Sequence, residues 1–196
     1  MASITSGLLT TCADLNAVGG IRQIFITDLA NVTGVTPATA PTTGIITNFV
    51  VAAANPWARF ETKQGEAAMT INGTKEGGAT KYEIGLNFYV PNITGERLAA
   101  LQHLGDACPV AIVEFFSGVR VIVGFSYLFA NQSQGTTFWT RNQTYANLKT
   151  IEGGSGMAIT DPNGLTVTLS ATQWELPYTY SGALSIETGD ITATSL

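Results

Sequence analysis

Charged side chains are scarce in this chain of 196 residues. Lys and Arg number nine and Asp and Glu fourteen, or 12% of the residues, which is about half the share typical of soluble domains. The formal net charge is -5. So few basic residues argue against a nucleic-acid binder that neutralises phosphates, because such proteins need clustered Lys and Arg. The low charge predicts a surface wetted by neutral polar groups and partly covered by partners.

Cysteine and histidine are nearly missing, which narrows the possible chemistry. Cys12 and Cys108 make no disulfide framework, so we expect two free thiols and synthesis in a cytoplasm. The single histidine, His103, is the sole candidate for Ser-His-Asp or Cys-His catalysis, and it falls within a predicted helix. Too few ligands remain for tetrahedral zinc, and no glycine run fits a phosphate-binding loop. We expect no cofactor, no metal and no enzymatic activity.

Long hydrophobic runs are also lacking. The most apolar stretch, Cys108 to Ala130, is interrupted by Glu114 and Arg120, so no membrane-spanning segment is expected. The first fifteen residues have no basic start and include Asp14, which is not typical of a secretory signal.

Threonine, glycine and asparagine are abundant instead, at 28, 21 and 11 residues. Threonine favours strands, whereas glycine and asparagine favour turns. The composition predicts one mainly β domain over residues 1–196: an antiparallel β-sandwich or partial barrel with one short α-helix and long loops. The expected strands outside the two hairpins described next are 21–28, 45–53, 57–63, 165–172 and 178–186.

Two hairpins stand out. The first joins 66–74 to 80–90 through a Lys-Glu-Gly-Gly turn, and period-two alternation gives it one apolar and one polar face. The second joins 108–116 to 119–129 and is apolar on nearly both faces, as in a sheet covered on both sides by its own sandwich or by a neighbouring subunit. Between them, Thr94 as N-cap and Leu98, Leu101 and Leu104 as a stripe predict a helix over 93–104.

Three segments lack clear periodicity. Residues 30–44 hold two prolines and no charge, which predicts an extended surface loop used for contacts. Residues 187–196 predict a mobile tail. The segment 131–147 is polar but aromatic, and we assign it no role.

Two further functions are compatible with these residues. A sandwich that binds a receptor or decorates a capsid would place Trp139 or Trp174 in its contact patch, although tryptophans also anchor subunit interfaces. A carboxylate-dependent hydrolase would need a cleft joining Glu83 and Glu114.

The order of these elements resembles the tail tube proteins of tailed bacteriophages. The resemblance covers most of the chain: an early Thr-rich loop, the two hairpins with the helix TGERLAALQHLG between them, and the closing segment GSGMAITDPNGLTVTLSATQWELPY. It implies hexameric rings in which each subunit adds strands to a continuous inner β-barrel, with the helix outside the sheet. The rings stack through loops and termini, and the genome passes through the lumen into the host.

The resemblance also implies partners and a location. These are further copies of the chain, tape-measure and tail-terminator or baseplate proteins, a sheath if the tail contracts, and double-stranded DNA that passes without specific binding. The protein would be made in the bacterial cytoplasm and reside in the virion tail. The expected lumen-facing residues are Glu66, Thr70, Asn72, Glu83 and Asn87. The expected ring-stacking residues are Val35, Thr36, Pro37, Thr39, Pro41 and Thr42.

Overall fold

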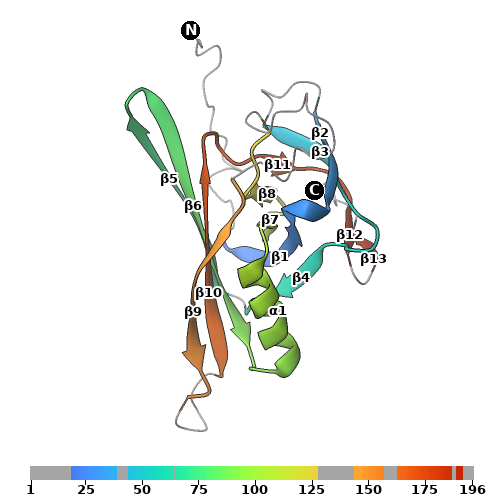
Figure 1. The fold of residues 1–196 in the computed structure, drawn as a ribbon, viewed down its shortest axis with the longest axis vertical. Helices are drawn as coiled ribbons and strands as arrows, with labels where there is room; N and C mark the ends of the chain where they lie inside the picture. The colour runs from blue at the N-terminus through green and yellow to red at the C-terminus, as the bar shows by residue number, and fades with distance from the viewer. Residues whose placement is uncertain are drawn as a thin grey trace.

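The computed structural model describes residues 19–38, 44–63, 65–127, 144–156, 163–186 and 189–191. It is mainly β with one α-helix, as the composition predicts (Figure 1). The strands are β1 (Ile21–Asp28), β2 (Val32–Pro37), β3 (Ile45–Val51), β4 (Ala58–Glu61), β5 (Ala67–Glu76), β6 (Ala79–Pro91), β7 (Pro109–Phe115), β8 (Arg120–Val123), β9 (Asn147–Gly154), β10 (Gly164–Gln173), β11 (Thr179–Tyr180), β12 (Leu184–Ile186) and β13 (Gly189–Ile191). The helix α1 spans Gly95–Asp106, and a 3-10 turn spans Leu29–Asn31.

The strands form two principal sheets. The seven-stranded sheet has the order β2-β3-β11-β8-β7-β1-β4, and the four-stranded sheet has the order β5-β6-β10-β9. Every pair within them is antiparallel except β3 with β11. Strands β12 and β13 form a separate small sheet.

Two apolar clusters lie on opposite faces of the seven-stranded sheet. Alternate residues of β1 divide between them: Phe25 belongs to one cluster, and Ile24 and Ile26 belong to the other. The first cluster contains Trp57, Phe49 and Phe125 and is enclosed by the seven-stranded sheet and the C-terminal strands. The second is shared with the inner face of the four-stranded sheet and with α1, so the two sheets pack face to face.

The apolar hairpin of β7 and β8 is covered on both faces within one chain. Ile112 and Ile122 enter the first cluster, while Val113 and Val123 enter the second. Of the two explanations for its composition, its own sandwich therefore suffices for these strands, and no neighbouring subunit is needed.

Residues 30–44 are not one extended loop, contrary to the sequence prediction. Val32–Pro37 is strand β2, and it pairs with β3 so that Val35 lies opposite Phe49. The β-branched residues of this stretch favour a strand, and Pro37 is tolerated because it ends a strand at the edge of the sheet. Residues 39–43 lie outside the described residues.

Other boundaries also differ from the prediction. The second strand of the apolar hairpin, expected over 119–129, is β8 and ends at Val123, because Gly124 has a positive φ of 84° and leaves the extended conformation. The last strand, expected over 178–186, is split into β11 and β12 around Gly182, where a Cβ would come within 2.3 Å of the Thr47 carbonyl oxygen. Part of the expected mobile tail forms β13, which pairs with β12. Strand β9 was not predicted, and it forms one edge of the four-stranded sheet.

The helix begins two residues later than expected and is capped by the expected residue. The Thr94 hydroxyl accepts a hydrogen bond from the Arg97 amide. Leu101 and Leu104 are buried in the second cluster, whereas Leu98 is 47% exposed. The helix therefore packs on the sandwich through only part of the predicted stripe.

Candidate functional site

The outward face of the four-stranded sheet, called here the polar face, gathers the predicted lumen-facing residues. Asn72 of β5 lies directly opposite Glu83 of β6, and Asn87 lies opposite Ala68. Thr70 lies opposite Gly85, which has no side chain to cover it. All four predicted residues are exposed, while alternate residues of β6 are buried against the second cluster. The fifth, Glu66, is exposed immediately before β5.

Strands β10 and β9 extend the polar face with residues that the sequence prediction did not include. In the register of β10 with β6, Thr168 lies opposite Asn87 and Thr172 lies opposite Glu83. On β9, Thr150 lies opposite Thr168 and Glu152 lies opposite Thr166. Apolar and polar residues alternate over 165–172, which indicates the outward side of β10 but not which strands lie beside it. The result is a face across four strands rich in hydroxyl and amide groups.

Lysines are few on this face. Lys63 donates a hydrogen bond to Glu66 at 2.5 Å and lies 5.9 Å from the centre of the Tyr89 ring. The hydrogen bond and the charge of Glu66 raise the pKa of Lys63, so the lysine stays protonated and neutralises one carboxylate. Lys81 lies opposite Thr74 and makes no salt bridge within the described residues.

Glu83 and Glu114, the pair considered for hydrolysis, lie in different surroundings. Glu83 is exposed on the polar face, whereas Glu114 is buried on β7 in the seven-stranded sheet. Glu114 accepts hydrogen bonds from Arg120 Nε at 2.7 Å and Gln23 Nε2 at 3.0 Å, so its oxygens are engaged. The second apolar cluster lies between the two sheets that carry these carboxylates.

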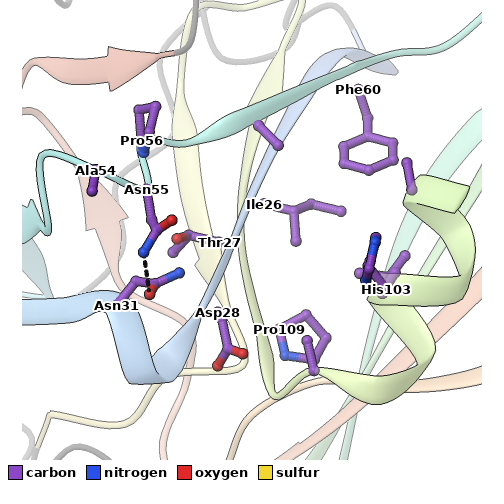
Figure 2. A pocket seen from close by; sticks show the side chains of 14 residues that line it. Ile26, Thr27, Asp28, Asn31, Ala54, Asn55, Pro56, Phe60, His103 and Pro109 are labelled. Atoms are coloured by element: carbon purple, nitrogen blue, oxygen red, sulfur yellow. Dashed lines mark hydrogen bonds between the residues drawn. The ribbon is translucent and has the colours of Figure 1, made fainter. Parts of the chain in front are cut away.

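A pocket of about 420 Å³ lies between α1 and the ends of β1 and β4 (Figure 2). Its walls are largely apolar and include Ile26 and Phe60, and Asn55 donates a hydrogen bond to Asn31 at 3.1 Å on one side. His103 of α1 is exposed and also lines it. The Thr27 hydroxyl is shielded from solvent and has no hydrogen-bond partner among the described residues, so it offers no accessible nucleophile.

The other predicted residues are dispersed. Val35, Thr36 and Pro37 lie on β2, at the edge of the seven-stranded sheet opposite to β4. The remaining stacking candidates, Thr39, Pro41 and Thr42, lie outside the described residues, as does Trp139. Trp57 is fully buried, and Trp174 is about half exposed just after β10. Cys108 is a free, partly buried thiol.

No protein-family model, curated protein or solved structure matches this chain. Within the described ranges, no three His, Cys, Asp or Glu side chains gather in a way that could hold a metal ion. The helix found there is neither long nor apolar enough to cross a membrane.

Proposed function

We propose that this chain is a tail tube protein of a tailed bacteriophage, which assembles into stacked hexameric rings and conducts DNA through their lumen. The single observation that carries the proposal is the four-stranded sheet. One face is polar and exposed, and the other is buried in the second cluster. Its outer strands, β5 and β9, pair with no further strand among the described residues. Open edges of this kind invite pairing with another chain, and closure into a barrel removes them.

The strand directions in the sheet suit closure by rotation. Neighbours alternate in direction across β5, β6, β10 and β9, so β5 and β9 run opposite to each other. When copies are related by rotation about an axis along the sheet, β9 of one copy meets β5 of the next in antiparallel orientation. An even number of alternating strands therefore closes without a parallel pair at the junction.

The expected dimensions suit a conduit. Six copies of four strands give 24 strands in the inner barrel. With strands about 4.8 Å apart and tilted about 40°, such a barrel has a backbone diameter of roughly 45–50 Å. Side chains reduce this to a bore of roughly 35–40 Å, and barrels of about 16–18 strands already enclose an aqueous channel.

The chemistry of the polar face suits passage without adhesion. Each lysine that contacts a phosphate releases counterions and favours binding, so a surface of Thr, Asn and Glu keeps DNA free to slide. Six copies with a net charge of -5 carry -30 in total. That charge repels phosphates, an effect that weakens as salt screens it.

The proposal extends to partners and location. Tubes of this kind meet tape-measure proteins inside, terminator or baseplate proteins at their ends, and a sheath in contractile tails. The protein would be made in the host cytoplasm and carried in the virion tail.

Electron microscopy of the purified protein at high concentration is the test. We expect rings or tubes with a central channel. A chain that stays monomeric, and that is also missing from the tails of particles released by its host, would contradict the proposal.

One observation favours a second function, a β-sandwich that binds a receptor or a capsid. Trp174 and Leu176 are both exposed in the segment after β10, where they could meet a partner. That function predicts a monomer or trimer whose binding is lost when both residues become alanine. Rings and tubes that survive this double substitution would favour the tail tube instead.

A further inference from the structure

Both open edges of the four-stranded sheet carry an isoleucine on the inner side that remains exposed. On β5, Ile71 lies opposite the fully buried Ile84 and is 43% exposed. On β9, Ile151 lies opposite the fully buried Val167 and is 40% exposed. Directly opposite residues share a face of the sheet, so both isoleucines point to the core side. Each isoleucine side chain is exposed on the side where no further strand of the sheet covers it.

A third exposed residue, Leu98 of α1, lies close to the level of Ile151. Gly105 of α1 lies so close to β9 that a Cβ on it would be 3.3 Å from Leu148 Cδ2. The helix begins next to the end of β6, which is level with the end of β9, so helix and strand run in opposite directions. Leu98 is seven residues before Gly105, about 10 Å along the helix. Because of the bulge in β9, Leu148 and Ile151 lie opposite Leu169 and Val167, which are two residues apart on β10, so Ile151 is about 7 Å beyond Leu148 along the sheet.

We infer that β5 of one copy pairs with β9 of a second copy so that Ile71 lies opposite Ile151, beneath Leu98 of that second copy. This inference rests on the proposed function, because it names the contact that closes the ring. The three side chains, all partly exposed in a single chain, then continue the second apolar cluster across the junction between copies.

The register that pairs the isoleucines also suits the other residues of the two edges. On the polar face it places Thr70 opposite Glu152 and Asn72 opposite Thr150, so no like charges meet. A different register would have to shift by two residues, because a shift by one would move every side chain to the other face of the sheet. A shift that places Ile71 opposite Lys149 would place Ile151 opposite Met69, and the opposite shift would pair both isoleucines with glycines, Gly153 and Gly73. Only the unshifted register therefore pairs the two exposed isoleucines with each other.

Cysteine cross-linking tests this contact. The variant Ile71→Cys/Ile151→Cys is made with Cys12→Ser and Cys108→Ala, so that no native thiol competes. Directly opposite residues in antiparallel strands have Cα atoms about 4.5–5.5 Å apart, within the range that a disulfide spans. Mild oxidation of assembled protein should give a ladder of linked chains up to six on a non-reducing gel, and neither single-cysteine variant should give it.

The shifted pair Ile71→Cys/Lys149→Cys is the matched control, and we expect it to link at least tenfold more slowly. In parallel, Ile71→Glu should abolish assembly, whereas Leu176→Glu should retain it, because Leu176 is 57% exposed but lies outside both edges. Rings that link through the shifted pair, or that tolerate Ile71→Glu, would overturn this contact and leave the tail tube standing. A wild-type chain that forms no assembly and is absent from tails would overturn both.

Discussion

Arg120 donates a hydrogen bond from Nε to Glu114 Oε2 at 2.7 Å, and both side chains are only 5% exposed. The pair joins β7 to β8 at the end of the hairpin, and Arg120 also donates to the Gly182 carbonyl oxygen at 3.2 Å. Arg22 and Gln23 of β1 donate to the other carboxylate oxygen. One buried ionic group therefore connects β1, β7, β8 and the C-terminal segment.

Breaking this pair should cost far more than breaking a surface pair. Arg120→Leu leaves a buried carboxylate without its nearest cation, and we expect a loss of about 3 kcal/mol in the free energy of unfolding. Arg59→Leu removes the more exposed pair with Glu61 and should cost less than about 1 kcal/mol. Urea unfolding of both variants measures the difference, and equal losses would refute this role for the buried pair.

Positive charge on the polar face should slow the passage of DNA. The variant Glu83→Lys/Asn87→Lys replaces two exposed residues of β6 with groups that bind phosphates. We expect intact tubes and slower DNA ejection, with the delay shrinking as salt rises. The control Ala53→Lys/Glu61→Lys makes the same change in charge at exposed positions off this sheet. If the variant ejected DNA as fast as the wild type, the polar face would not line the lumen.

Shortening the connection between β2 and β3 should uncouple rings from one another. Deleting Val35 to Thr42 would also remove half of β2, so the sharper variant deletes only residues 39–42. We expect isolated rings in place of tubes, together with an unchanged melting temperature, which serves as the control for folding. Full-length tubes from this variant would exclude the segment from ring stacking.

The elements that could be predicted are those in which apolar and polar residues alternate along the whole length of the strand or helix. The hairpin of β5 and β6 shows period two over both strands, because one face meets the core and the other meets water. The helix could be placed by Thr94, whose side chain caps it as expected. The face that holds Thr70, Asn72, Glu83 and Asn87 followed from this local pattern.

What could not be predicted depends on pairings between distant segments. Strand β9 has a bulge opposite Thr168 and Leu169, which breaks the period between Leu148 and Ile151. Strand β2 contains Gly34 and ends in Pro37, and its pairing with β3 outweighs those weak local preferences. The order of strands, and hence the identity of the open edges, requires contacts that no single segment encodes.

Alkaline pH should destabilise the fold through Tyr178. Burial first, and then the hydrogen bond that its hydroxyl donates to Glu175 at 2.9 Å, raise the pKa of this phenol well above its usual value. A raised pKa in the folded state means full stability below the unfolded value of about 10 and a loss as pH rises beyond it. Tyr178→Phe should therefore give a shallower decline in unfolding free energy between pH 9 and pH 11. A decline as steep as in the wild type would contradict this assignment.

Substitutions of Leu98 and Leu101 should affect different properties, the assembly of copies and the stability of a single chain respectively. Leu101 is buried in the second cluster, so Leu101→Ala should cost about 2–5 kcal/mol in the free energy of unfolding of a single chain. Leu98 is about half exposed, so Leu98→Ala should cost about 1 kcal/mol there. It should also raise the protein concentration needed for assembly, because the exposed half of Leu98 is covered only between copies. Denaturant unfolding of monomers and light scattering during assembly measure the two effects. If Leu98→Ala assembled at the wild-type concentration, α1 would have no part in the junction between copies.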